Sequence, residues 1–246
     1  MRGLISIGLI PRPITRFPEH IHNTWEIVYY TYGTGILKIG DREYNFKPKD
    51  IICQPPGIPH SEYSDTGYQN IHFSIESFHD FNNIPHHFTD TVDRDYYNIL
   101  IQLHREFHLK RRNWINITEA LLNVLYQYML SWGNEKKKNP AVEQLENILI
   151  SNISNNNLRL EKELNKIPVS ADHLRKLFKK ETGKTPVEYL TDMRINYAKQ
   201  LLKSNKNNLS IKEIAAMVGF NDPYYFSRVF KKVTSLSPTQ WAENNI

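Results

Sequence analysis

Residues 209–232, which read LSIKEIAAMVGFNDPYYFSRVFKK, have the pattern of two short helices joined by a tight turn. Ser210 and Glu213 have the spacing of a capping box, in which each side chain satisfies a free backbone amide at the start of a helix. Gly219 is the residue type best suited to a left-handed turn after that helix. The pair 222–223, Asp-Pro, matches the N-cap and first position of a second helix. The stretch therefore predicts a helix-turn-helix motif.

The second helix of this motif has one apolar and one polar face. Phe226, Val229 and Phe230 fall on one stripe, which predicts the buried side. The opposite face has side chains suited to phosphates and to base edges in a major groove, namely Tyr224, Ser227, Arg228 and Lys231. Arg228 is the best candidate for guanine, because its two donors fit O6 and N7. The alternative is an ordinary solvated helix surface.

Residues 158–180 repeat this pattern, but their capping and turn residues are less clear. An apolar short helix leads through a Pro168 turn to a second helix capped by Ser170. The outward face of that second helix carries Asp172, Arg175, Lys176 and Lys179. Asp172 either contacts cytosine or only stabilises the N-terminus of its helix. The lysines near the ends of both second helices either contact phosphates or are ordinary surface charges. A long helix from Pro186 to Lys203 is predicted to join the two motifs.

This arrangement resembles the DNA-binding domain of the AraC/XylS family of bacterial transcription regulators. The residues that carry the resemblance are Phe178 to Pro186, Arg194-Ile195, Ala198, Leu201-Leu202, Ile214-Ala215, Gly219-Phe220, Tyr225 to Lys232 and Ser237-Pro238. The resemblance implies two tandem motifs that read successive major-groove segments, about 34 Å apart along the duplex. Pro168 stands where the family usually has glycine, so the first turn is expected to be built differently.

Charge supports DNA binding independently. Residues 140–246 hold 16 Lys and Arg against 11 Asp and Glu, whereas residues 1–139 hold 15 of each, so the net charge of +5 belongs to the second half. Such a surplus is typical of proteins that displace counterions from phosphates. The length of 246 residues predicts two domains, and the lone Cys53 predicts a buried strand residue in a reducing cytoplasm. We find no signal peptide and no apolar run of membrane length, and expect no membrane contact.

The first half predicts short strands at 25–32, 36–39, 42–46, 51–53 and 69–75. Strands at this spacing suggest an antiparallel barrel or jelly roll, so the fold class expected for the chain is α+β. Within this region His20, His22 and Glu26, followed by a Pro-x-Gly-x-x-His segment ending at His60, resemble the two motifs of the cupin fold. We place His20 and His22 on one strand, where residues two apart leave by the same face, and Glu26 shares that parity.

In cupin enzymes the equivalent residues converge on one metal, and imidazoles with a carboxylate suit iron, manganese, zinc or nickel. The sensor domains of AraC/XylS regulators commonly resemble cupins and often keep these polar positions without a metal. We therefore expect a pocket for a sugar-like or other small polar effector, with no metal, no cofactor and no catalytic residue. Its candidate lining residues are His20, His22, Trp25, Glu26, Tyr44 and His60, although Trp25 and Tyr44 could equally be core aromatics.

Two amphipathic helices are predicted at 93–109 and 114–132, either as a dimerisation element or as a cover for the barrel. A polar stretch follows and indicates a linker. The predicted domains are a barrel at 1–90, a helical pair at 91–133, a linker at 134–140 and a DNA-binding domain at 141–246.

The sequence therefore predicts a cytoplasmic, dimeric regulator that binds double-stranded DNA and a small effector, and RNA polymerase if it is an activator. The alternatives are a metal-dependent cupin enzyme fused to a DNA-binding module and a dimeric regulator without a ligand.

Overall fold

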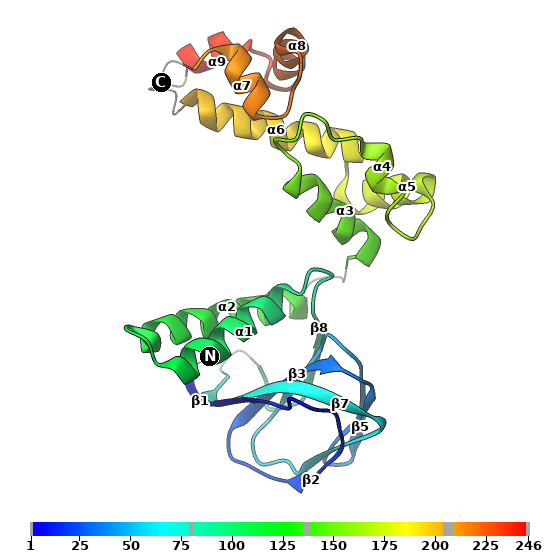
Figure 1. Cartoon of the computed structure of the whole chain (residues 1–246), viewed down its shortest axis with the longest axis vertical. Coiled ribbons are helices and arrows are strands. Elements are labelled where there is room, and N and C mark those ends of the chain that lie inside the picture. The colour runs from blue at the N-terminus through cyan, green and yellow to red at the C-terminus, as the bar shows by residue number, and fades with distance from the viewer. Residues whose placement is uncertain (1, 79–80, 135–137, 204–208, 245–246) are drawn as a thin grey trace. The chain divides into compact units, whose positions relative to one another are not determined.

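The computed structural model describes residues 2–78, 81–134, 138–203 and 209–244. The chain divides into two compact units, Met1–Lys137 and Lys138–Ile246. The described strands all lie in the first unit, together with two helices, and the described elements of the second unit are helices (Figure 1). The α+β prediction is therefore confirmed. Among the described helices, none has the length and apolarity needed to cross a membrane.

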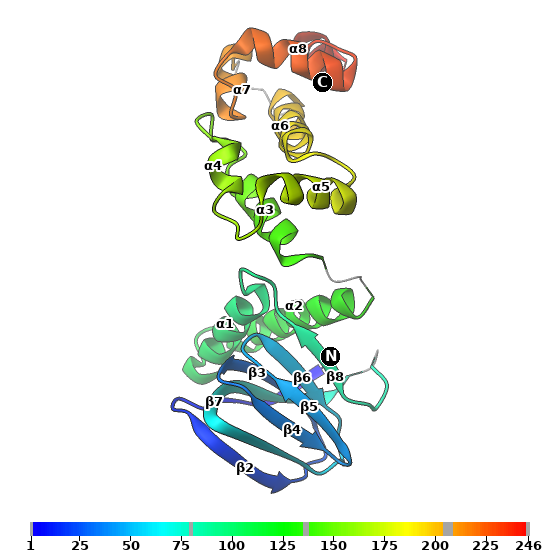
Figure 2. The same cartoon turned by 90° about the vertical axis from the view of Figure 1, so that its right-hand side faces the viewer.

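The first unit is a curled antiparallel sheet (Figure 2). Its strands are β1 (Arg2–Leu9), β2 (Ile14–His20), β3 (Trp25–Tyr32), β4 (Gly35–Ile39), β5 (Arg42–Phe46), β6 (Asp50–Gln54), β7 (His60–Ser77) and β8 (His86–Thr89). The order is β5-β4-β7-β3-β6-β8, and β1 and β2 also pair with β7. The long β7 pairs with β2 and β4 in its first part and with β1 and β3 in its second, so it curls the sheet.

The predicted strand at 69–75 is thus only the second part of β7. Strands β1 and β8 were not predicted, and of β2 only its last residue, His20, was placed on a strand. Strand β2 is almost wholly exposed, so its sequence lacks the apolar alternation that marks a strand.

The sheet has two apolar faces because successive strand residues point to opposite sides. Ile27 and Tyr29 of β3 belong to a core shared with helices α1 (Asp95–Leu109) and α2 (Trp114–Asn134). Val28 and Tyr30 belong to a second core inside the curled sheet. Helices α1 and α2 therefore cover one face of the sheet, close to the bounds that the sequence predicted. Cys53 is fully buried under them, as expected.

The second unit contains α3 (Pro140–Ser151), α4 (Leu160–Leu164), α5 (Ala171–Thr182), α6 (Pro186–Lys203), α7 (Ile211–Met217), α8 (Pro223–Thr234) and α9 (Pro238–Glu243). Helices α4 and α5 form the first helix-turn-helix motif, and α7 and α8 form the second. Helix α6 joins them with the bounds that the sequence predicted, and contributes to the hydrophobic core of each (Figure 1).

The helix caps of the second motif agree with the sequence. Ser210 and Glu213 form the capping box, and Asp222 accepts a hydrogen bond from the amide of Tyr224 at 2.8 Å. Gly219 has the left-handed φ of 84° that its turn requires. In the first motif the Pro168 turn is tight, with the amide of Val169 donating to the carbonyl of Ile167 at 2.7 Å.

The division between the two units, after Lys137, falls inside the predicted linker at 134–140, although helices extend into both ends of that linker. Asn134 is the last residue of α2, and Pro140 is the first residue of α3, with Asn139 as its N-cap. Residues 135–137 lie outside the described residues. The sequence analysis missed α3 and α9, although both start with a capping residue followed by proline.

Candidate functional site

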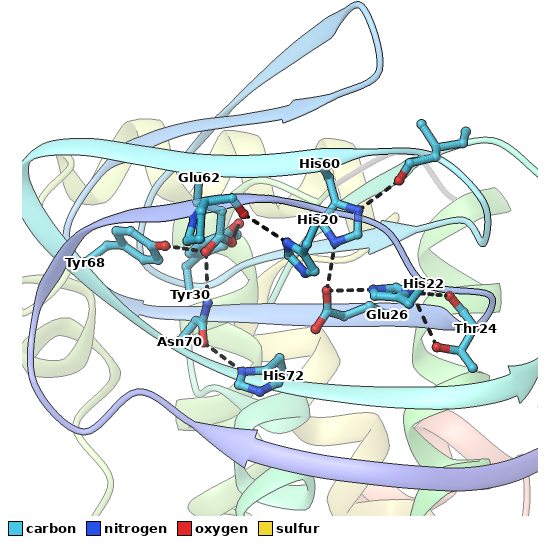
Figure 3. A network of polar contacts seen from close by, with 12 residues as sticks. His20, His22, Thr24, Glu26, Tyr30, His60, Glu62, Tyr68, Asn70 and His72 are labelled. Carbon is cyan, nitrogen blue, oxygen red and sulfur yellow. Dashed lines mark hydrogen bonds and ion pairs between the residues drawn. The ribbon is translucent and has the colours of Figure 1, made fainter.

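A cluster of three histidines and one carboxylate lies inside the curled sheet (Figure 3). His20 ends β2, His22 lies in the loop before β3, Glu26 is on β3 and His60 starts β7. One potential ligand atom from each lies within 4.8 Å of those of the others. Glu26 Oε2 is 3.3 Å from the Nε2 atoms of both His22 and His60.

The cluster forms by a route that the sequence analysis did not foresee. His20 and His22 do not share a strand, because β2 ends at His20 and His22 belongs to the connection that follows. His20 reaches the cluster because β2 pairs with β7 in a register that sets it opposite His60. The predicted convergence is therefore present, but the strand-parity argument for it was wrong.

The backbone orients all three imidazoles in the same way. Each Nδ1 lies within hydrogen-bond distance of a backbone carbonyl, which can only accept, so each Nδ1 carries a proton. The acceptors for His20, His22 and His60 are the carbonyls of Pro18 (3.1 Å), Thr24 (2.9 Å) and Ile58 (3.0 Å). In a neutral ring the Nε2 lone pair is then free, which is how metal-binding histidines are held. The residues therefore fit a divalent transition metal, held by three Nε2 atoms and the Glu26 carboxylate.

Charge within the cluster centres on Glu26. Burial alone would raise the pKa of this carboxyl, but hydrogen bonds from His22 and His60 outweigh burial and hold the pKa well below its usual range. The hydrogen bond to Glu26 in turn raises the pKa of His22 above 6.5. Without a bound cation, the Glu26 carboxylate therefore favours the protonated form of His22.

A small cavity of about 40 Å³ adjoins the cluster. Its lining residues are Ile10, Phe17, His20, Glu26, Val28, Gln54, His60, Glu62, Asn70 and His72. Glu62 is buried and accepts hydrogen bonds from the hydroxyls of Tyr30, at 2.6 Å, and Tyr68 (Figure 3). The side-chain oxygen of Gln54, which is 1% exposed, has no hydrogen-bond partner among the described residues. The cavity therefore offers an unused acceptor to a ligand that donates hydrogen bonds.

The sequence analysis missed four of these polar residues, Gln54, Glu62, Asn70 and His72. A signal existed, because polar residues at alternate positions of a strand, such as Asn70 and His72, share a face. Gln54 is directly opposite Glu26 in the β3–β6 pairing, which only the structure reveals.

Of the six predicted lining residues, His22 belongs to the adjoining cluster and does not line the cavity, and two others lie elsewhere. Trp25 points to the opposite side of β3 from Glu26, where it is buried in the core beneath the helices, with its ring centre 5.2 Å from that of Phe78. Tyr44 packs half-buried against the core inside the sheet and does not line the cavity. Both are core aromatics, which is the alternative that the sequence left open.

On α8 the outward face matches the sequence prediction, with one difference. Tyr224 is 81% exposed, and Arg228 and Lys231 are exposed beside it. Ser227 is half-buried, and its hydroxyl donates to the carbonyl of Pro223 at 2.9 Å, so its proton is already used and its oxygen can only accept from a partner. Tyr225, which the sequence analysis did not select, is also exposed, with its ring centre 5.9 Å from the Arg228 guanidinium.

On α5 the four predicted side chains also face outward or lie at the rim. Asp172, Lys176 and Lys179 are exposed. Arg175 is half-buried and forms ion pairs with Asp172, at 2.9 Å, and with Glu161 of α4. Arg175 must therefore exchange these acidic partners for DNA groups before it can contact a base or a phosphate.

A curled ligand-binding sheet and a unit with two helix-turn-helix motifs together define a ligand-responsive DNA-binding regulator as the class of this protein. Comparison with protein families agrees. Residues 9–125 match the AraC-like ligand binding domain, and residues 165–244 match a helix-turn-helix domain. The chain belongs to the AraC family of transcription regulators.

Named relatives cover most of the chain. It is 28% identical to the HTH-type transcriptional activator RhaR of Enterobacter sp. (strain 638), over 93% of this chain and 88% of that protein. It is 27% identical to the arabinose operon regulatory protein of Escherichia coli (strain K12), over 85% and 77% of the two chains. Among solved structures, the C-terminal domain of AraT, a response regulator from Geobacillus stearothermophilus, is 32% identical over 45% of this chain and 90% of that structure, with a TM-score of 0.42.

Proposed function

We propose that this regulator reads its operator through α5 and α8, and that a small polar effector in the sheet cavity controls its affinity for DNA. The observation that carries the DNA part is the duplicated motif on α6, with an exposed polar face on each second helix. The side chains proposed to contact DNA are Asp172, Arg175, Lys176, Lys179, Tyr224, Ser227, Arg228 and Lys231. Asp172 and Arg175 form an ion pair with each other. The others offer hydrogen-bond donors, except Ser227, whose hydroxyl already donates to the carbonyl of Pro223.

The effector part rests on the cavity. The Gln54 oxygen, which has no hydrogen-bond partner among the described residues, and the buried Glu62 carboxylate can both accept hydrogen bonds from a ligand. The other lining residues are polar as well, apart from Ile10, Phe17 and Val28. Such a site favours a compact molecule with several hydroxyl groups over an apolar one. We therefore propose that the cavity senses a hydroxylated effector and performs no chemistry, so that the chain is a regulator and not an enzyme.

A screen for the effector tests this proposal. Neutral monosaccharides are added to the full-length protein while its thermal unfolding and its affinity for a selected DNA duplex are followed. A true effector must bind the two functional states unequally, so it must change DNA affinity as well as stability. Gln54→Leu should abolish both responses, whereas Tyr44→Phe, outside the cavity, should keep them. A response that survives in Gln54→Leu would place the effector elsewhere.

We also propose that α2 pairs with α2 of a second copy. Ile117, Leu121, Val124 and Tyr128 follow one another at intervals of four, three and four residues, which is the seam of a two-stranded coiled coil. Ile117 and Val124 are 38% and 40% exposed, so the rest of the unit does not cover these two positions, whereas Leu121 and Tyr128 are half-buried against its core. A cytoplasmic location and contact with RNA polymerase, if the protein activates transcription, complete the proposal.

A metal cation is the second candidate for the cavity, and the orientation of the three imidazoles favours it. His20, His22, Glu26 and His60 would hold the ion, which would supply a Lewis acid that can anchor a hydroxylated effector. Elemental analysis of protein purified without chelator tests this directly. One equivalent of iron, manganese, zinc or nickel, lost in His60→Ala and retained in His72→Ala, would support the metal, whereas metal-free protein that still responds to an effector would exclude it.

A further inference from the structure

The two helix-turn-helix motifs share α6, but each packs on its own hydrophobic core. The core of α4 and α5 takes Leu190 from the first half of α6. The core of α7 and α8 takes Ile195, Ala198 and Leu202 from the second half. Among the described residues these two cores have no member in common. Apolar packing therefore fixes each motif on α6, but the two cores do not join one motif directly to the other.

Arg194 lies on α6 between the two sets of core residues. Its guanidinium donates from Nε to the carbonyl of Ile153 at 2.8 Å, and from Nη2 to the carbonyl of Asn155 at 2.7 Å. Both acceptors belong to the segment between α3 and α4, on the side of the first motif. The same guanidinium lies 5.6 Å from the ring centre of Phe220, in the turn of the second motif. One half-buried cation thus contacts both halves of the unit through charge-assisted hydrogen bonds and a cation–π contact.

The turn of the second motif fits closely against this cation. A Cβ atom at Gly219 would lie 2.5 Å from the carbonyl oxygen of Ile153 and 2.8 Å from Arg194 Nη2. The backbone at Gly219 therefore lies too close to these atoms for any side chain to fit. Beside it, the side-chain amide of Asn221 donates to the carbonyl of Asn156 at 3.1 Å. We call Arg194, residues 153–156 and residues 219–221 together the Arg194 joint.

We infer that Arg194 is a positioning residue that fixes the separation and relative rotation of α5 and α8, and thereby the operator spacing that the chain accepts. This inference rests on the proposal that both helices bind DNA. Two linked binding elements gain from each other only when their geometry matches the two sites. With a rigid joint, the protein therefore binds an operator of the correct spacing with high affinity and other spacings poorly. With a loosened joint, it binds the correct spacing more weakly and loses less affinity when the spacing changes.

Three DNA probes and four forms of the full-length protein test the inference. The first probe is a duplex that the wild-type protein selects from random DNA. The second has one base pair inserted between the two contacted segments, which moves the outer segment by about 3.4 Å and about 35°. The third keeps one segment only. The proteins are wild type, Arg194→Ala, Asn221→Ala and Asn196→Ala, the last an exposed α6 residue outside the joint that serves as the control.

Wild type and Asn196→Ala should lose at least about tenfold in affinity on the inserted duplex. Arg194→Ala should bind the selected duplex about fivefold more weakly than wild type, yet lose less than about threefold on insertion. Asn221→Ala should show the same two changes in affinity, but smaller. Because Asn221 is exposed, this variant tests the joint even if Arg194→Ala does not fold.

Equal penalties for insertion in wild type, Arg194→Ala and Asn221→Ala would overturn the inference. Equal binding of wild type to the selected duplex and to the single-segment duplex would instead contradict the two-helix reading on which the inference rests.

Discussion

Glu26 is the residue around which the polar cluster is organised, because two imidazoles approach one of its oxygens. The hydrogen bond between Glu26 and His22 contributes both to the lowered pKa of Glu26 and to the raised pKa of His22, and His60 also lowers the pKa of Glu26. On α8, Arg228 is exposed and forms no ion pair with a described residue, whereas Arg175 of α5 is already paired with two carboxylates. Individual side chains therefore set the charge of the cavity and, in the proposed function, the strength of each DNA contact.

The His22–Glu26 pair predicts a specific pH dependence of stability. His22 gains proton affinity on folding, so its contribution is complete below about pH 6.5 and is lost as the pH rises through its raised pKa. Glu26 loses proton affinity, so its contribution is present above about pH 4.5 and is lost only in stronger acid. In metal-free protein, Glu26→Gln should return the pKa of His22 toward its usual value, as followed by NMR titration of the histidine side chains. An unchanged His22 titration would rule out this coupling.

Arg228→Ala should lower affinity for the selected duplex by about 1–3 kcal/mol and relax the preference at one base position. The reason is that a guanidinium in the major groove discriminates bases through its two donors. Lys231→Ala is the matched comparison and should weaken binding to all sequences alike, with a smaller salt dependence. Both can be measured by fluorescence anisotropy on single-base variants of the duplex. Uniform weakening by Arg228→Ala would make Arg228 a phosphate contact.

The cavity shows how far single residues can be predicted from sequence. Histidine and glutamate spacing indicated the cluster correctly, because the cupin-like motif encodes it even though the strand assignment was wrong. Trp25 was misplaced because a neighbour in sequence is on the opposite face of a strand. Gln54 could not be found, since its place opposite Glu26 depends on strand pairing across 28 residues, which periodicity does not reveal.

Among the elements, the helices of the second unit owe their bounds to local signals. The capping box at Ser210 starts α7, and the Asp222–Pro223 pair starts α8. These signals act within one turn of helix and can be read from sequence. The strands β1 and β8 and the exposed β2 have no such signal, because their pairing partners are distant in the chain.

Ser210→Ala should destabilise α7 locally by about 1 kcal/mol, because it removes the acceptor for the amide of Glu213. Hydrogen–deuterium exchange of residues 211–217 in the full-length protein measures this, with exchange expected about fivefold faster. Ser210→Asp keeps an acceptor at the N-cap and should exchange like wild type. Equal exchange in Ser210→Ala and wild type would show that packing, and not the cap, determines the stability of α7.

Val124→Lys should convert a dimer into a monomer, because it places a charge in the proposed α2 seam. The matched control is Gln127→Lys, which adds the same charge at an exposed α2 position outside the seam. Sedimentation equilibrium distinguishes the two states. A Val124→Lys protein that remains dimeric while Gln127→Lys dissociates would move the interface to another face of α2.

At the scale of the whole molecule, the chain combines a sensing unit and a reading unit that have separate cores. The charge asymmetry in the sequence agrees with this division, because the net positive charge belongs to residues 140–246. Within the reading unit, α6 and the Arg194 joint hold two motifs together, and this duplication is the feature from which the account of DNA binding follows.

Hydroxyl-radical footprinting of the full-length protein on its selected duplex tests that account most directly. Two protected segments on one face of the DNA, with centres about one helical turn apart, are predicted for two helices that enter successive major grooves. Arg175→Ala should weaken protection in one segment and Arg228→Ala in the other. A single protected segment, weakened by both substitutions, would contradict the claim that α5 and α8 read DNA together.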